Sequence, residues 1–386
     1  MYNLVNIYIF VASMLVMHSN AFRGTVQGGV RRGLPQLQAT TTLSVGTQNL
    51  DWPNLGFEYR QTNCFTEVDY KSGEWGPVQT NSDQYVKIHI GATALHYGQA
   101  CFEGLKAFHC ADGKVRIFRP RENAARINNS SKRVCMPPMP EKLFLQAVRE
   151  VVMANLDFVP PYGTGGALYI RPLLYGSGPK IGLQPAEEYK FVCLVMPVAD
   201  YYRGGLKPVS AVVIDDFDRA APRGVGSAKV AGNYAADLLP NMEAKKAGFP
   251  IGLYLDAKTN SMIEEFSTSN FLAIDNDGNY VTPKSDAILA SITNKSLMEL
   301  AVAGGMKVQQ RPVPIQELMD GHFTEAAACG TAVVVTPVKE VLYKGSTYSI
   351  GKGDDSVGPV IKGLYDRVRA IQVGEIEDSL GWMEEV

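Results

Sequence analysis

The chain has 386 residues, of which 46% are hydrophobic and 20% are charged, a composition that can form a sizeable buried core. Its formal net charge of -2 at pH 7, with scattered lysines and arginines, excludes the basic surface that nucleic-acid binding needs. The six cysteines are too few for a disulfide framework and form no C-x-x-C pair, so we expect mostly reduced core thiols and no metal site.

The N-terminal region has the composition of a targeting leader, because no Asp or Glu occurs before Asp51. The apolar run from Leu4 to Met17 is typical of a signal peptide, which we place at residues 1–21. Residues 22–48 are basic and rich in Thr and Gly, as transit peptides are. Together they resemble the bipartite plastid leaders of algae with secondary plastids; a mitochondrial presequence or plain secretion is the alternative. We expect no membrane segment in the mature protein.

Strand and helix signals mix throughout the rest of the chain, which predicts an α+β protein with a small N-terminal domain at residues 49–197. Alternating apolar residues predict a strand over 85–92, and Asp112-Gly113 predicts the turn of a hairpin over 105–118. The segment 141–156 carries a helical apolar stripe. The apolar, β-rich segments 166–176 and 190–198 are predicted central strands.

The stretch 197–208, "PVADYYRGGLKP", shifts to Pro, Gly and charge, and residues 198–206 within it are predicted to link this domain to a larger C-terminal domain at 207–386. There the sequence predicts a helix over 233–248, with an irregularity at Pro240. A strand over 251–256, a hairpin over 271–283 and a helix over 292–305 follow. Two α+β lobes with a small-molecule site in the cleft between them is the simplest architecture.

Several common catalytic motifs are absent or fail on inspection. The segment Gly176 to Gly182, "GSGPKIG", has its last glycine one residue late for a dinucleotide fingerprint and is followed by no predicted helix. The chain contains no Walker A motif, no H-E-x-x-H and no G-x-S-x-G, and its five histidines have no metal-ligand spacing. NTPase, metalloenzyme and serine hydrolase functions are therefore disfavoured.

Lys229 is the most suggestive titratable residue, in "GSAKVAGNY". Most lysines are solvated surface residues, and spacing alone cannot reject that interpretation. Its small neighbours, however, allow close backbone approach, and Asn233 and Tyr234 offer polar groups. A shielded lysine has a lowered pKa and becomes a nucleophile toward an aldehyde, which suggests Schiff-base chemistry.

The sequence around Lys229 resembles the K-x-G-G-N-Y segment of branched-chain amino-acid aminotransferases, which are pyridoxal 5'-phosphate (PLP) enzymes of fold type IV. Further segments resemble the family's signatures in the same order, over roughly residues 50 to 375: "TALHYGQACFEGLKAF" (93–108), "VRIFRPRENAARI" (115–127), "GALYIRPLL" (166–174), "IEEFSTSNFLAI" (263–274), "ILASITNKSL" (288–297) and "ACGTAVVVTPV" (328–338). The resemblance implies the two-lobed fold of D-amino-acid aminotransferase, with the cofactor between the lobes, and a homodimer whose active sites borrow residues from the partner chain.

The resemblance also implies cofactor-binding roles. Lys229 would hold PLP through its amine and then carry the proton as general base and acid. Glu265 would face the pyridine nitrogen, with its neighbour Glu264 as the rival, and Arg126 would hold the phosphate. Tyr234 would bind the phenolic oxygen of the cofactor. The remaining implied cofactor contacts are Thr268, Ile292, Thr293 and Thr331.

The implied substrate pocket is apolar, as leucine, isoleucine and valine require. Its implied aromatic residues are Phe57, Tyr97, Phe102 and Tyr169, although each could also be ordinary core. The backbone amides of Thr331 and Ala332 would bind the substrate α-carboxylate. Arg171 would let the same pocket accept the distal carboxylate of glutamate or 2-oxoglutarate.

The expected activity is reversible amino-group transfer between these branched amino acids and 2-oxoglutarate. A D-amino-acid aminotransferase or an aminodeoxychorismate lyase of the same fold is the alternative. A catalytically inactive binding protein is a more distant one, since Lys229, Glu265 and Arg126 are all present.

Overall fold

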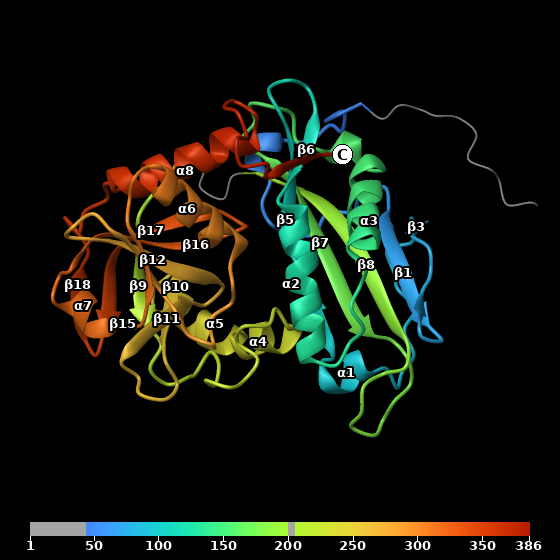
Figure 1. The fold of residues 1–386 in the computed structure, drawn as a ribbon, viewed down its shortest axis with the longest axis horizontal. Helices are drawn as coiled ribbons and strands as arrows, with labels where there is room; N and C mark the ends of the chain where they lie inside the picture. The colour runs from blue at the N-terminus through green and yellow to red at the C-terminus, as the bar shows by residue number, and fades with distance from the viewer. Residues whose placement is uncertain (1–43, 200–204) are drawn as a thin grey trace, which may run out of the picture. The chain divides into compact units, whose positions relative to one another are not determined.

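The first of two β-sheets is formed by strands of the N-terminal half of the chain together with β19 near the C-terminus (Figure 1). The computed structural model describes residues 44–199 and 205–386, so the predicted leader lies outside the described residues except for 44–48. The sheet order is β19-β6-β5-β7-β8-β1-β2, with β3 on β1 and β4 on β7. The bounds are β1 (Phe65–Lys71), β2 (Glu74–Trp75), β3 (Gln79–Asn81), β4 (Ala100–Phe102), β5 (Leu105–His109), β6 (Val115–Phe118), β7 (Ala167–Gly176), β8 (Tyr189–Val198) and β19 (Met383–Glu385).

The strands β7 and β8 pair along their whole lengths at the centre of this sheet, which confirms both predicted strands. The predicted hairpin is also present, as antiparallel β5 and β6, with Gly113 at a φ of 80° that favours glycine. The helices α2 (Pro120–Arg133) and α3 (Glu141–Met153) cover the sheet. Pro140 immediately precedes α3, which buries Phe144 and Val148 in the first core.

The predicted strand over 85–92 is wrong. These residues form no strand, and only Ala92 makes an isolated bridge, to Pro179. Of the alternating apolar residues, Val86 and Ile90 are exposed, and Ile88 is partly buried against a small core cluster. A period of two predicts a strand only where a neighbouring strand supplies hydrogen bonds, and none lies beside this segment in the described part of the chain. The short helix α1 (Thr93–Tyr97) follows it.

The second sheet is formed by the C-terminal half. Its order is β14-β13-β12-β16-β17-β9-β10-β11-β15, with β18 on β17. The bounds are β9 (Val209–Val213), β10 (Ile251–Leu255), β11 (Met262–Phe266), β12 (Ser269–Asp275), β13 (Tyr280–Pro283), β14 (Val308–Arg311), β15 (Val313–Pro314), β16 (Phe323–Gly330), β17 (Val334–Tyr343) and β18 (Ser346–Ser349). The predicted strand and hairpin of this region are confirmed as β10 and β12–β13.

The predicted helix over 233–248 is two helices, α4 (Ala231–Ala236) and α5 (Leu238–Lys246). The break falls at Asp237 and not at Pro240. The buried Asp237 carboxylate accepts a hydrogen bond of 2.7 Å from the Tyr254 hydroxyl. The remaining helices are α6 (Ile292–Ala303), α7 (Ile315–Met319) and α8 (Pro359–Gln372), and the 3-10 turns are Trp52–Asn54 and Leu156–Phe158.

A shared core connects the two sheets. Phe108 and Phe118 of the first sheet pack in one cluster with Leu297 of α6 and Val368 of α8. The last strand, β19, returns to the first sheet and pairs with β6. The division into domains at 49–197 and 207–386 stays a prediction. Within residues 44–199 and 205–386, no helix is both long and apolar enough to cross a membrane.

Candidate active site

A cavity of about 590 Å³ is lined by residues of both sheets. It brings together most of the predicted site residues, which lie far apart in the sequence. The predicted residues on its wall are Phe57, Phe102, Arg126, Tyr169, Arg171, Lys229, Tyr234, Glu265, Thr268, Thr331 and Ala332. A volume of this size accommodates a cofactor-sized ligand.

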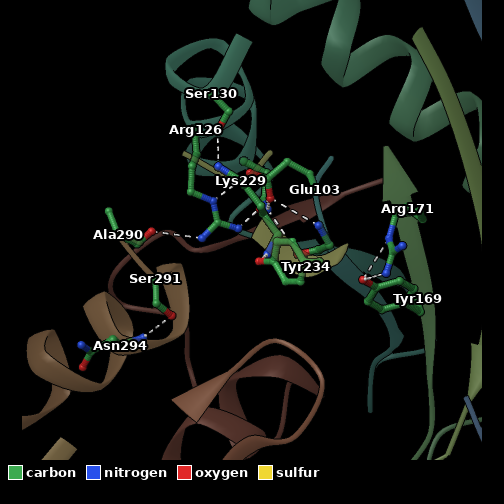
Figure 2. Close-up of polar contacts among 12 residues, drawn as sticks. Glu103, Arg126, Ser130, Tyr169, Arg171, Lys229, Tyr234, Ala290, Ser291 and Asn294 are labelled. Carbon is green, nitrogen blue, oxygen red and sulfur yellow. Dashed lines mark hydrogen bonds and ion pairs between the residues drawn. The ribbon is translucent and has the colours of Figure 1, made fainter. Parts of the chain in front are cut away.

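Lys229 is held at the cavity by contacts of its backbone and of its side-chain amine (Figure 2). Its backbone N–H donates to the Ser130 hydroxyl of α2 at 2.8 Å, and its carbonyl accepts the Phe102 N–H of β4 at 3.1 Å. Its amine donates to the Tyr234 hydroxyl at 2.7 Å. Burial, followed by the charge of Arg126, lowers the pKa of the Lys229 amine to about 7. A large fraction of this amine is therefore unprotonated at neutral pH.

Glu265, and not Glu264, faces the cavity. The two carboxylates point to opposite faces of β11, as successive residues of a strand do, and Glu264 accepts from Ser285 at 2.9 Å. The Glu265 carboxylate accepts the Asn270 side-chain amide at 2.9 Å and the Leu289 N–H at 3.0 Å. It also forms an ion pair of 2.6 Å with Arg219. Burial raises the pKa of Glu265 and Arg219 opposes that rise.

Arg126 projects from α2 and is held by a fully buried carboxylate (Figure 2). Its guanidinium donates to Glu103 through Nε at 2.7 Å and through one terminal nitrogen at 2.6 Å. The other terminal nitrogen donates to the Ala290 carbonyl at 3.0 Å. Burial opposes the charge on Arg126, but Glu103 outweighs it and raises the arginine pKa. The five N–H groups of a guanidinium leave donors available for an anion in the cavity.

The first turn of α6 lies beside Arg126. Ser291 is its N-cap and accepts the Asn294 N–H at 3.2 Å. Ile292 and Thr293 line a smaller adjoining cavity together with Thr331, and not the main cavity. The first N–H groups of a helix have no partner within the helix and favour anions.

Arg171 lies on the aromatic side of the cavity. Its guanidinium stacks over Phe102, 4.8 Å from the ring centroid, and donates to the Tyr169 hydroxyl at 2.8 Å. The Phe57 ring packs edge-on against Tyr169, with centroids 5.1 Å apart. An apolar wall and a cation therefore occupy the same region.

The turn between β16 and β17 contains Thr331 and Ala332. The buried Lys106 amine, on β5 of the first sheet, donates to the Ala332 carbonyl at 2.7 Å. Val334 ends the turn with a φ of 66°, which is an outlier for a β-branched residue. Strained backbone of this kind is found at functional sites where the surroundings hold it.

Tyr97 does not lie on the wall of this cavity. Its ring is 43% exposed, and its hydroxyl donates to the Ile181 carbonyl. Within residues 44–199 and 205–386, no cluster of His, Cys, Asp or Glu could hold a metal ion.

The sequence reasoning missed Glu103, Lys106 and Arg219. Glu103 and Lys106 stand in the quoted segment 93–108, where charges beside apolar strand residues could have signalled buried partners. Arg219 lies in "DRAAP", which carries no such signal. Their partners lie far from them in the sequence, so only the folded chain reveals these contacts.

Known proteins are similar to this chain over most of its length. The family model for class IV amino-transferases matches residues 100–341. The branched-chain-amino-acid aminotransferase of Haemophilus influenzae is 45% identical over 345 residues, covering 88% of this chain and 99% of the relative. Chloroplastic branched-chain-amino-acid aminotransferase 5 of Arabidopsis thaliana is 38% identical, covering 90% of this chain and 82% of the relative.

A solved structure of the branched-chain amino acid aminotransferase of Escherichia coli has a TM-score of 0.70 and 27% identity, covering 84% of this chain and 99% of that chain. This likeness confirms the predicted fold class. The chain therefore belongs to the class IV aminotransferases and, within them, to the branched-chain-amino-acid aminotransferases.

Proposed function

We propose that this aminotransferase uses PLP to transfer the amino group reversibly between L-leucine, L-isoleucine or L-valine and 2-oxoglutarate. The observation that carries this proposal is the Lys229 amine, whose pKa is about 7, in one cavity with Glu265 and Arg126. Such an amine is a nucleophile at neutral pH.

The donor set of the cavity fits PLP. Lys229 would hold its aldehyde carbon, Glu265 its pyridine nitrogen and Tyr234 its phenolic oxygen. Arg126 and the first turn of α6 would hold its phosphate, with Thr268 and Thr331 at the cavity wall. When bound, PLP supplies an electron sink for the pair left on the substrate Cα after deprotonation.

The residues of the chain would supply the proton transfers. The Lys229 amine can take the Cα proton and return it, because its lowered pKa keeps both protonation states accessible near pH 7. The Tyr234 hydroxyl, 2.7 Å from that amine, can orient it. Burial raises the Tyr234 pKa, which keeps the phenol protonated as a hydrogen-bond donor.

The substrate side chain would lie against Phe57, Phe102 and Tyr169, whose rings suit branched aliphatic groups. Arg171 would pair with the distal carboxylate of 2-oxoglutarate by leaving its contact with Tyr169. The substrate α-carboxylate would meet the N–H groups of the turn at Thr331 and Ala332. One cavity would then accept apolar and acidic substrates in turn.

A homodimer is part of the proposal. Large apolar side chains are exposed together at one region of the surface, which we call the α1 face: Ile90, Leu95, Tyr97, Ile181 and Leu183. Monomeric proteins rarely expose clustered residues of this kind, which favours burial against a second copy. Tyr97 belongs to this face, so its predicted role in a substrate pocket would be exercised in the partner subunit.

We also propose a plastid location. The predicted signal peptide and transit segment support it, as does the chloroplastic name of the Arabidopsis relative. Residues 1–50 fused to a fluorescent protein should accumulate in plastids of an alga with secondary plastids. Accumulation in mitochondria or in the medium would contradict the proposal.

The central experiment follows the visible absorption of a chain that begins at Val45, mixed with PLP. L-leucine should bleach the band of the bound cofactor and 2-oxoglutarate should restore it, while Lys229→Ala should show no cycle. Bleaching by D-alanine or aminodeoxychorismate instead of L-leucine would favour the two related activities. Failure to retain PLP would indicate an inactive binding protein.

A further inference from the structure

Arg119 is a buried cation that joins separate elements at the start of α2. Its backbone φ is 49°, a left-handed conformation that is uncommon for residues other than glycine. Its guanidinium donates to Glu299 of α6 through both terminal nitrogens, at 2.8 and 3.1 Å. It also donates to Ser296 at 3.0 Å, one turn earlier in the same helix. Arg119 therefore connects the beginning of α2 to the middle of α6.

The C-terminal tail completes this cluster. The Trp382 carbonyl accepts the Arg119 N–H at 2.6 Å, and the Arg119 guanidinium lies 4.9 Å from the centroid of the indole ring. The buried indole N–H donates to Glu299 at 3.1 Å. Beyond it, Glu384 of β19 pairs with Arg121 of α2 at 3.0 Å. The tail thus fixes both the backbone and the side chain of Arg119.

A second ion pair joins the same two helices. Lys295 of α6 lies 2.6 Å from Glu122 of α2. Downstream in α2, Arg126 donates to the Ala290 carbonyl, two residues before α6 begins. The phosphate-binding groups proposed above, the Arg126 guanidinium and the first turn of α6, belong to these two connected helices. The contacts of Arg119 with Ser296 and Glu299 are therefore part of the connection between these two helices.

We propose that Arg119, Glu299 and Trp382 are positioning residues for the phosphate end of the cofactor site, through which the C-terminal tail controls cofactor retention. This inference rests on the proposed function, because it assumes that Arg126 and the first turn of α6 hold the phosphate. None of the three residues lines the main cavity, so their effect is transmitted through the two helices.

When Glu299 is neutralised, its charge and its positioning role predict opposite changes in the affinity for the cofactor phosphate. Removing a negative charge near an anion site should strengthen phosphate binding if only electrostatics act. Loosening the connection between α2 and α6 should weaken it, because bidentate arginine contacts and helix N–H groups require fixed directions. The sign of the change therefore separates a positioning role from a general charge effect.

The experiment measures equilibrium binding of PLP and of pyridoxal, which lacks the phosphate, to cofactor-free protein at pH 7. Glu299→Gln should raise the Kd for PLP about tenfold, while the Kd for pyridoxal changes less than twofold. Trp382→Phe keeps an aromatic ring and removes the indole N–H, and it should shift the same ratio in the same direction. The matched control is Glu317→Gln. It breaks another bidentate arginine–carboxylate contact, between Arg311 and Glu317, which lies away from the cavity. The control should leave both constants unchanged.

A parallel weakening of PLP and pyridoxal, an unchanged ratio in both variants, or tighter PLP binding would overturn the inference. Circular dichroism of each cofactor-free variant establishes that it is folded. If Glu299→Gln does not fold, the binding ratio of Trp382→Phe tests the inference in its place. If wild type retains PLP and completes the leucine cycle while the ratio does not move, only this inference fails. If wild type binds no PLP, the proposed function fails and the inference fails with it.

Discussion

At the residue scale, Lys229 is a lysine whose charge is opposed by its surroundings. Burial and the nearby guanidinium groups of Arg126 and Arg171 lower its pKa to about 7, whereas Glu103 and Glu265 act in the opposite direction. We expect competitive acetylation of the cofactor-free protein, followed by mass spectrometry, to give half-maximal Lys229 reactivity near pH 7. Arg171→Met should raise that midpoint. A wild-type midpoint above pH 9 would contradict the electrostatic account.

The same pKa predicts how stability depends on pH. Between about pH 7 and pH 10.5, the unfolded chain binds a proton at Lys229 that the folded chain does not. The free energy of unfolding of the cofactor-free protein should therefore rise with pH in this window, relative to Lys229→Met. Urea denaturation of both proteins at pH 7 and pH 9.5 measures the difference. An equal pH dependence of the two proteins would show that the amine is not desolvated.

Arg219 should control the charge of Glu265. Arg219→Met would remove the ion pair that opposes the rise in the Glu265 pKa, so the carboxyl group would become protonated more readily. We expect kcat with L-leucine to fall at least 100-fold, about 2.7 kcal/mol, because a neutral Glu265 no longer favours a protonated pyridine ring. The control is Arg367→Met, at an exposed position of α8. A kcat within threefold of wild type would exclude this role of Arg219.

At the scale of elements, the loop that leads into Lys229 requires a glycine at position 226 and not merely small residues. A Cβ at Gly226 would overlap the Ala287 carbonyl oxygen, which also accepts from Arg219, and would come within 2.6 Å of Ala220 Cβ. Gly226→Ala should therefore destabilise the protein by about 1–3 kcal/mol in urea unfolding. At Gly363 on α8, an added Cβ would meet no atom within 4 Å, so Gly363→Ala should stabilise the protein by about 0.5–1 kcal/mol. Equal effects of the two substitutions would contradict this packing argument.

Long elements with a strong pattern were predictable, and short irregular ones were not. The apolar stripe of α3 and the apolar runs of β7 and β8 are recognisable in the sequence. Burial of one or both faces of an element produces a regular pattern of apolar residues. The segment 85–92 has the pattern of a strand but no partner strand. The partner of Asp237 at the helix break is Tyr254, which is distant in sequence. Local patterns contain no information about such partners.

At the scale of the whole molecule, the α1 face should be a subunit interface. Leu183→Asp, at a residue that is 83% exposed, should convert a dimer into monomers, because a charge cannot be buried against an apolar partner without cost. Light scattering after size-exclusion chromatography measures the mass. Val302→Asp, an exposed apolar position on α6, should leave the mass unchanged. A monomeric wild-type protein would end the dimer proposal.

The sequence by itself determined the family and the two-lobed α+β fold class, since reactive residue types occur in ordered local motifs. Most of the site residues that it predicted lie on the cavity wall. The sequence favoured Glu265 over Glu264, and the tertiary structure has Glu265 on the cavity wall and Glu264 on the other face of β11. Only the tertiary structure revealed that Tyr97 lies away from this cavity. It also revealed Glu103 behind Arg126, Arg219 behind Glu265, and the contacts of Trp382 with Arg119 and Glu299. These are electrostatic and hydrogen-bonding relations between segments more than twenty residues apart. Their energies depend on distance and burial, which the chain acquires only when it folds.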